Sequence, residues 1–262
     1  MINKLSEEQG ILRQTMLFTG LEVCAYNINR KQKDLKLFEF GKIYSKSGDK
    51  PWPYRETAKL GVYMTGNSKP ENWQNKSNAV SFYDLNQQVS QILVKCAVND
   101  VTRDDTQDPL FDYGLNLTSG SGKLGVIGKV KSTIQKEFGI KQEIFFAELD
   151  TALLFNSASP KLVIQEVPRF PDVRRDLSLV IDKSVRFRDI EELVASTEKR
   201  LIKELTVFDV YEGDNIPKNK KAYALAFIMR DEKKTLTDEE VDATMNKLMG
   251  AFEKKLGAMI RK

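Results

Sequence analysis

Basic residues gather at the ends of two predicted strands in the last third of the chain. One pair precedes a strand expected at 176–182, and the others flank a strand expected at 222–230. They are Arg174, Arg175, Lys220, Lys221 and Arg230. Guanidinium and ammonium groups bind phosphate through charge-assisted hydrogen bonds, so these side chains could hold a nucleic-acid backbone.

Small residues occupy one face of these strands. Three alanines at even positions between 222 and 226 alternate with larger apolar residues, which we expect to face helices. The alanine face, beside Ser178, is expected to be flat, and Tyr211 near a strand end is the aromatic residue placed to stack on a base. Such a face suits a phosphate backbone or stacked bases. An ordinary sheet face docked against another domain has the same geometry.

Periodicity gives the last third the order strand, helix, strand, strand, helix, strand. The strands are predicted at 176–182, 203–211, 222–230 and 258–261, and the helices at 188–200 and 238–256. Thr237 and Glu240 form the capping box of the second helix, and Gly257 ends it. This order is the ferredoxin-like arrangement, a four-stranded antiparallel sheet with both helices on one face.

The first part of the chain is also predicted to be α+β. A helix is expected at 11–30, with Leu12, Met16, Val23 and Tyr26 on its apolar stripe. Further elements follow in order. Strands are expected at 35–44, 56–65, 115–117, 124–130 and 144–149, and helices at 83–96, 131–138 and 150–155. The first two strands form an antiparallel hairpin with a long connection that contains Trp52.

Residues 156–171 contain three prolines. Pro160, Pro168 and Pro171 lack backbone donors and restrict the residues before them, which marks an interdomain connector. We therefore predict two domains, at 1–160 and 168–262. Arg174 and Arg175 are placed where the connector meets the second sheet.

Two motifs suggest ligand sites that their surroundings do not support. The glycines at 120, 122 and 125 match a dinucleotide-binding pattern, but a strand rather than a helix is expected after them, which favours a hairpin turn. Asp104, Asp105 and Asp108 could bind a cation, but a solvated turn fits them better because no further ligands have the spacing of a calcium loop.

The composition removes several kinds of catalytic site. The chain has 262 residues, a net charge of +4 and no histidine, which excludes Ser-His-Asp triads, Cys-His nucleophiles and histidine metal ligands. Cys24 and Cys96 lie in predicted helices and fit buried, reduced thiols. Neither a membrane span nor a signal peptide is recognisable, so we expect a cytoplasmic protein.

Three ordered motifs in the last third carry a family resemblance. They are Phe-Pro-x-Val-Arg-Arg-Asp at 170–176, Phe-Asp-Val-Tyr-x-Gly at 208–213 and Thr-Leu-Thr-Asp-Glu-Glu-Val at 235–241, followed by Arg261. This region closely resembles the anticodon-binding ferredoxin-fold domain at the C-terminus of the bacterial phenylalanyl-tRNA synthetase beta subunit.

The first part resembles the same subunit. Its motifs are Leu-Arg-Gln-Thr-Met-Leu at 12–17, Asn-Ile-Asn-Arg at 27–30 and Leu-Phe-Glu-Phe-Gly at 37–41. They are similar to the start of the catalytic-like module, which resembles a class II aminoacyl-tRNA synthetase core. At 128–132 the chain has Gly-Lys-Val-Lys-Ser, where the family often has Gly-x-x-His-Pro. The full subunit is longer, so the chain resembles its C-terminal portion, and no editing activity is expected.

The resemblance implies a non-catalytic part of a phenylalanine–tRNA ligase. Its first domain would contact a catalytic alpha subunit in a tetramer of two alpha and two beta subunits, and its second would bind the tRNA anticodon stem-loop. ATP and Mg²⁺ would serve the complete enzyme, with no cofactor or metal held by this chain; no membrane or DNA partner is expected. The candidate RNA-binding residues are Arg174, Arg175, Ser178, Tyr211, Lys220, Lys221 and Arg230.

The sequence also fits two rival functions. A protein-interaction module would use the flat sheet face without contacting RNA. A free-standing ATP-using enzyme would need several arginines on its nucleotide, and Arg55 is the one candidate that the sequence offers near the expected hairpin. We therefore expect this chain alone to be inactive.

Overall fold

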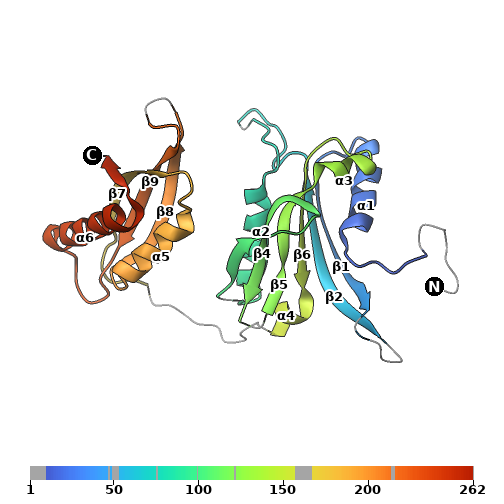
Figure 1. Ribbon diagram of the computed structural model, residues 1–262, viewed down its shortest axis with the longest axis horizontal. Helices are drawn as coiled ribbons and strands as arrows, with labels where there is room; N and C mark the ends of the chain where they lie inside the picture. Colours follow the sequence, from blue (N-terminus) through green and yellow to red (C-terminus); the bar gives the residue numbers. More distant parts are fainter. Residues whose placement is uncertain are drawn as a thin grey trace. The chain divides into compact units, whose positions relative to one another are not determined.

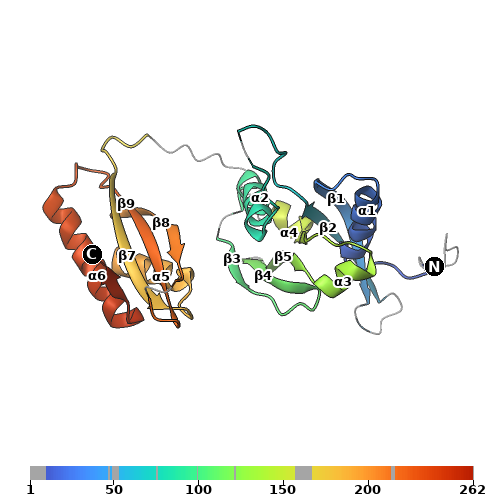
Figure 2. The same ribbon diagram turned by 90° about the horizontal axis from the view of Figure 1, so that it is seen from above.

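The computed structural model divides the chain into two compact units, Met1–Val163 and Ile164–Lys262 (Figures 1 and 2). It describes residues 10–46, 48, 53–74, 76–98, 100–120, 122–156, 167–213 and 216–261. Trp52, Pro160 and most of the expected connector lie outside these residues. Within the described ranges, no helix has the length and apolar character needed to cross a membrane. Both units are α+β with antiparallel sheets and flanking helices, which confirms the predicted fold class.

The first unit contains an antiparallel sheet between two sets of helices (Figure 1). Its elements are α1 (Leu17–Asn29), β1 (Leu35–Lys46), β2 (Tyr54–Thr65), α2 (Phe82–Lys95), β3 (Thr102–Asp105), β4 (Phe111–Ser119), β5 (Gly122–Val130), α3 (Ser132–Glu137), β6 (Ile144–Asp150) and α4 (Thr151–Asn156). The six described strands lie in the order β1-β2-β6-β5-β4-β3.

Alternate residues of its central strands enter two different hydrophobic cores. On β2, Leu60 and Val62 pack with α2 and α4, whereas Tyr63 packs with α1. On β6, Phe145 and Phe146 divide in the same way. Because successive side chains of a strand point to opposite faces, helices cover this sheet on both sides.

The predicted apolar stripe of the first helix is wrong in its N-terminal extent and in its buried side. The helix begins at Leu17 rather than near residue 11, and its buried side chains include Leu21 and Cys24. Val23 and Tyr26, which we placed on the core side, are exposed. The cause is Gly20: it faces Tyr63 so closely that a Cβ there would lie 2.0 Å from the ring.

The glycine-rich segment is the turn of a hairpin, as predicted. It connects β4 and β5, which pair from Ser119–Gly122 back to Phe111–Val130. The acidic cluster differs from the expectation, because Asp104 and Asp105 belong to β3 and pair with β4 instead of forming a turn. No group of three or more potential metal-binding side chains occurs in the part of the chain that the structure describes.

The second unit has the ferredoxin-like topology. Its elements are β7 (Val173–Asp182), α5 (Phe187–Thr197), β8 (Ile202–Tyr211), β9 (Lys220–Met229), α6 (Asp238–Leu256) and β10 (Met259–Arg261). The strand order is β10-β7-β9-β8, and each neighbouring pair is antiparallel. The first and second strands of the unit are thus separated by the third, as in a split βαβ motif.

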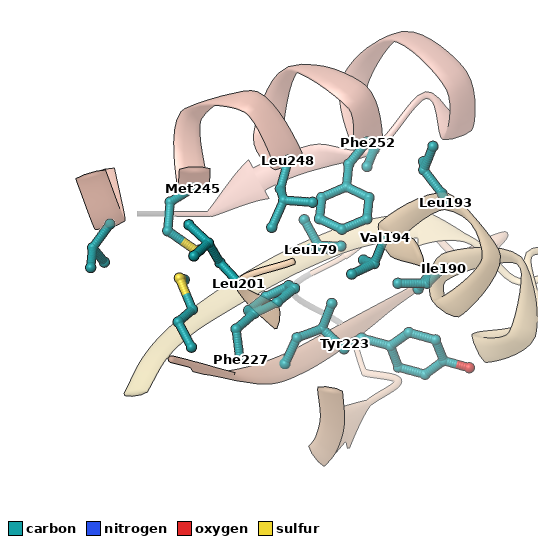
Figure 3. Close-up of a cluster of buried hydrophobic side chains, with 14 of the residues drawn as sticks. Leu179, Ile190, Leu193, Val194, Leu201, Tyr223, Phe227, Met245, Leu248 and Phe252 are labelled. Carbon is teal, nitrogen blue, oxygen red and sulfur yellow. The ribbon is translucent and has the colours of Figure 1, made fainter. Parts of the chain in front are cut away.

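Both helices of this unit pack on the same face of the sheet. Figure 3 shows Leu193 and Val194 of α5 and Leu248 and Phe252 of α6 converging on one cluster with strand residues such as Phe227. The predicted capping box holds the start of α6: the Glu240 amide donates to Thr237 Oγ1 at 3.4 Å, and Glu240 accepts from the Thr237 amide at 3.2 Å. Gly257 ends the helix in the left-handed conformation. The opposite face of the sheet carries no helix among the described residues.

Candidate nucleic-acid interface

The strand register defines the residues on the open face of the second sheet. Ser178 pairs with Ala224, which in turn pairs with Asp209 of β8. One row further on, Ala222 lies between Val180 and Tyr211. Directly paired residues of antiparallel strands share a face, so these side chains all lie away from the helices.

A hollow of about 300 Å³ opens on this face. Its lining residues are Ser178, Asp209, Tyr211, Ala222, Ala224 and Arg261. The alanines form a shallow floor, and the polar groups surround it. A carboxylate that accepts hydrogen bonds, a hydroxyl that donates or accepts, a guanidinium that donates and an aromatic ring are therefore within one small site.

A β-bulge places two of these side chains. Strict alternation along β8 would put Asp209 and Tyr211 on the same side as Val207, whose side chain packs into the helix-covered core. The register shifts between Val207 and Asp209, and the extra residue turns Asp209 and Tyr211 to the open face. Gly213 leaves room for the Tyr211 ring, since a Cβ at this position would lie 2.3 Å from the hydroxyl oxygen.

Phe208 is the residue at the bulge, and it is an exposed aromatic that the sequence reasoning missed. Its side chain is 53% exposed. The Arg174 guanidinium lies 5.4 Å from the centroid of its ring. The signal that could have identified it is the run Val-Phe-Asp-Val-Tyr, in which alternation alone cannot satisfy all the apolar positions.

Arg174 lies on the open face, and its guanidinium is hydrogen-bonded to a carboxylate. Its Nε donates to Asp176 Oδ1 at 2.8 Å and its Nη2 to Asp176 Oδ2 at 3.3 Å. This hydrogen-bonded carboxylate raises the pKa of the Arg174 guanidinium. Arg174 therefore remains a cation that an incoming phosphate would share with Asp176.

Arg175 and Lys221 do not lie on the open face, which corrects their predicted placement. Arg174 and Arg175 are inside β7 rather than at its junction with the connector, so they point to opposite sides. Arg175 instead donates to Asp238 at 3.1 Å, at the start of α6. Lys221 lies 4.9 Å from the Tyr223 ring on the helix side.

The remaining basic candidates lie at the ends of the sheet. Lys220 has the register of the open face and pairs with Asp182. Arg230 follows the end of β9, where its Nη1 donates to Asp172 at 2.9 Å. The structure thus brings together Ser178, Tyr211 and Arg261, adds Asp209, and places Arg174 and Lys220 further along the same face.

The first unit has a larger hollow, of about 1050 Å³, beside the start of α1. Of the described residues that line it, three are acidic, namely Glu22, Asp108 and Glu148, and one is basic, Arg13. An excess of carboxylates repels the phosphates of a nucleotide. This charge balance is unfavourable for binding a triphosphate in this hollow.

Arg13 was not considered in the sequence reasoning, and its contacts show what it does. Its Nε donates to the Lys42 carbonyl at 2.8 Å, its Nη1 to Thr19 Oγ1 at 3.1 Å and its Nη2 to Glu39 at 2.8 Å. These bonds connect the segment before α1 to strand β1 and to Thr19 in the first turn of α1. Arg55 lines a separate hollow with Lys123, so the two arginines do not form one cluster there.

Comparisons with known proteins agree with the division of the chain into two units. Residues 1–151 match the family model described as "Phenylalanyl tRNA synthetase beta chain CLM domain". Residues 168–261 match the model described as "Ferredoxin-fold anticodon binding domain".

Curated relatives cover all or nearly all of the chain. The phenylalanine–tRNA ligase beta subunits of Porphyromonas gingivalis and Bacteroides thetaiotaomicron are each 38% identical over 100% of this chain and 33% of their own length. The subunit of Thermotoga maritima is 32% identical over 97% of this chain and 32% of its own. The chain therefore spans about a third of the length of the curated relatives it matches.

A solved pyrrolysyl-tRNA synthetase from Desulfitobacterium hafniense matches 57% of this chain over 54% of its own, with a TM-score of 0.42 and 11% identity. The two family matches follow the two units of the fold. The chain belongs to the phenylalanyl-tRNA synthetase beta chain family, and it contains the CLM domain followed by the ferredoxin-fold anticodon-binding domain.

Proposed function

We propose that this chain is a non-catalytic part of a phenylalanine–tRNA ligase that acts in the cytoplasm. The second unit binds the anticodon stem-loop of the tRNA, and the first unit assembles with a catalytic alpha subunit. The observation that carries the proposal is the hollow of the open sheet face, where Asp209, Tyr211 and Arg261 surround a floor of alanines in a domain of the anticodon-binding family.

The hollow has the chemistry that an unpaired base requires. A base stacks on an aromatic ring, and its amino and imino groups donate to carboxylate oxygens. Tyr211 supplies the ring and Asp209 the carboxylate, while the small floor lets the base approach the sheet. Arg261 then lies where it can hold an adjoining phosphate, with Arg174 and Lys220 further along the face.

The experiment that tests RNA binding is a fluorescence-anisotropy titration of labelled phenylalanine tRNA with the chain over a series of salt concentrations. We expect log affinity to fall linearly with log salt, by about 0.7 to 0.9 for each phosphate contacted. A second transcript with a changed anticodon is expected to bind more weakly at every salt concentration.

The main alternative is a protein-interaction module that makes no RNA contact. It predicts no saturable change in anisotropy with either transcript. Equal binding of both transcripts, with a normal salt slope, would show that the basic face holds any RNA backbone and would refute anticodon recognition.

Assembly is supported by three apolar residues on the exposed side of α1, which they share with Glu22. Phe18, Val23 and Tyr26 are all exposed, although their helix packs its other side into the core. An apolar surface of this kind is typical of a contact between subunits. Mass measurement after co-expression with an alpha subunit tests this proposal, and we expect a complex of two alpha and two beta subunits. Replacing Val23 and Tyr26 by aspartate is expected to release the chain from that complex.

The chain alone is proposed to lack adenylation activity. The hollow of its first unit is lined by more carboxylates than guanidinium groups, and Arg13 is bound to Glu39. ATP and Mg²⁺ are therefore assigned to the alpha subunit of the complete enzyme. Measurable ATP–pyrophosphate exchange by the purified chain, without that subunit, would refute this assignment.

A further inference from the structure

Trp73 is the most exposed large apolar side chain among the described residues, at 93%. It lies in the connection between β2 and α2, in the first unit and outside the elements that carry the proposed functions. Single exposed apolar residues are common on proteins and need no explanation by themselves. Trp73 differs from such residues in two respects. The base of its loop is closed by a β-bridge and hydrogen-bonded to β1, and the loop sequence carries lysines and amides.

The base of this loop is firmly tied to the sheet. Asn67 forms a β-bridge with Ala79, and the Ser68 amide donates to the Asn78 carbonyl at 2.8 Å. The Lys36 ammonium group also donates to the Ser68 carbonyl at 2.7 Å. Gly66 turns the chain with a φ of +80°, in a place where a Cβ would lie 2.3 Å from the Lys33 carbonyl oxygen. The loop therefore leaves the sheet in a defined direction.

The tip of the loop is also ordered by a local hydrogen bond. The Gln74 amide donates to Asn72 Oδ1 at 2.9 Å, which forms a turn with Trp73 at its centre. The indole ring is thus presented by a closed turn on an anchored base. We call residues 66–74 and 76–79 the tryptophan loop.

The residues around Trp73 distinguish between two classes of partner. A tryptophan at a protein interface normally lies at the centre of a packed apolar patch. The tryptophan loop has no other large apolar residue: its tip consists of amides, one proline, Glu71 and two lysines. Within the described residues, neither Lys69 nor Lys76 forms an ion pair, so both ammonium groups are available to an anion. An exposed aromatic ring in a loop that also carries lysines and amides within four residues of it in the sequence is typical of a segment that stacks a base and holds its phosphates.

We propose that the tryptophan loop is a second RNA contact of this chain, in which Trp73 stacks on an unpaired base and Lys69 and Lys76 hold the adjoining phosphates. This inference rests on the proposed function, because the RNA is taken to be the tRNA. It differs in place from the anticodon hollow, since it belongs to the first unit. It assigns to that unit a part in tRNA binding as well as in assembly.

The chain provides its own optical probe. Its sequence has two tryptophans, so a Trp52→Phe variant leaves Trp73 as the sole indole. Titration of this variant with a phenylalanine tRNA transcript is expected to quench the emission of Trp73, with the same midpoint as the anisotropy curve. In binding measurements, Trp73→Ala is expected to weaken tRNA affinity roughly 5- to 150-fold, and Trp73→Phe to keep most of it.

Phe38→Ala is the matched control. Phe38 is 71% exposed on the edge strand β1 of the same unit, and its loss is expected to leave tRNA affinity unchanged. If the tRNA binds while Trp73 emission and the affinity of Trp73→Ala stay unchanged, the inference is wrong and the proposed function stands. If Trp73→Ala instead reduces recovery of the co-expressed alpha subunit with unchanged RNA affinity, the loop is a protein contact and the inference is also wrong.

A short oligouridylate separates failure of this inference from failure of the proposed function. Stacking on a tryptophan tolerates any base, so this probe is expected to quench Trp73 even without the tRNA fold. Quenching by the oligonucleotide with no tRNA binding would refute the proposed function and leave the RNA contact of the loop supported. Absence of quenching by both probes would refute the loop contact.

Discussion

The guanidinium carbon of Arg174 lies 5.4 Å from the centroid of the Phe208 ring. Arg174 belongs to β7 and Phe208 to β8, and β9 runs between those two strands. The Arg174 side chain therefore reaches across β9, where Ala226 lies between Asp176 and Thr206 and is only 5% exposed. The open face is consequently less bare than its sequence suggests: an arginine that RNA could recruit lies across part of it.

The opposite orientation of Arg174 and Arg175 gives a direct test of which one contacts RNA. We expect Arg174→Gln to weaken tRNA binding several-fold and to reduce the salt slope by about 0.7 to 0.9, because one phosphate contact is lost. Arg175→Gln is the matched control, since it removes the same charge on the helix side of the strand. Anisotropy titrations at several salt concentrations measure both. Equal losses from the two variants would indicate a general charge effect rather than a contact.

Because the bulge in β8 turns Tyr211 to the open face, we expect its ring to contribute to tRNA affinity. Removal of its ring by Tyr211→Ala is expected to weaken tRNA affinity roughly 5- to 150-fold, because a stacked base loses its aromatic partner. Tyr211→Phe keeps the ring and is expected to retain most of the affinity. The neighbouring Val210 has the register of the opposite face, so Val210→Ala serves as the control. An unchanged affinity of Tyr211→Ala would exclude the hollow as a base site.

The bulge also shows where sequence reasoning reached its limit. The four strands of the second unit, their order and the side occupied by its helices follow from alternation and capping residues, and the structure confirms them. Alternation assumes an unbroken period of two, and a single extra residue reverses every side chain after it. Asp209 and Phe208 were missed for this reason. Tyr211 was placed on the open face, but the bulge that turns it there was not predicted.

The buried side of the first helix was predicted wrongly for a related physical reason. Helical periodicity shows which residues share a side, but Val23 and Leu21 belong to two apolar stripes of similar strength. What decides between them is the close approach of Gly20 to Tyr63, a contact between residues far apart in the sequence. Pairs such as Arg13 with Glu39 are likewise visible only after folding.

Gly20 and Gly250 should respond to alanine in opposite directions. Each lies within a helix, where alanine is intrinsically favoured by about 0.5 to 1 kcal/mol. A Cβ at Gly250 would meet no atom within 4 Å, so Gly250→Ala is expected to stabilise the second unit by about that amount. At Gly20 the same Cβ would overlap the Tyr63 ring, and we expect Gly20→Ala to destabilise the first unit by about 1 to 3 kcal/mol. Urea unfolding measures both changes. Stabilisation by both variants would show that Tyr63 can move aside at little cost.

The two cysteines are expected to differ in reactivity. Cys24 is fully buried in α1, and burial raises the pKa of its thiol from 9.0 to about 11. Cys96 is half-buried at the end of α2. Because the thiolate is the reactive species, iodoacetamide at pH 8 is expected to alkylate Cys96 and to spare Cys24. Peptide mass mapping identifies the modified site, and the same reaction in urea, where both thiols should react, is the control.

The raised pKa of Cys24 also predicts that the first unit loses stability in alkali. The folded state disfavours the thiolate, so the stabilisation is complete below pH 9 and is lost as the pH rises through about 11. A two-unit difference in pKa corresponds to a loss on the order of 3 kcal/mol. Burial also raises the pKa of Tyr63, whose hydroxyl donates to the Met16 carbonyl, and this group acts in the same direction above pH 10. Urea unfolding between pH 8 and 11 is expected to show a falling midpoint. Cys24→Ala should flatten part of that fall, and Tyr63→Phe a further part. If neither variant changes the slope, the alkaline loss must arise from groups outside this core.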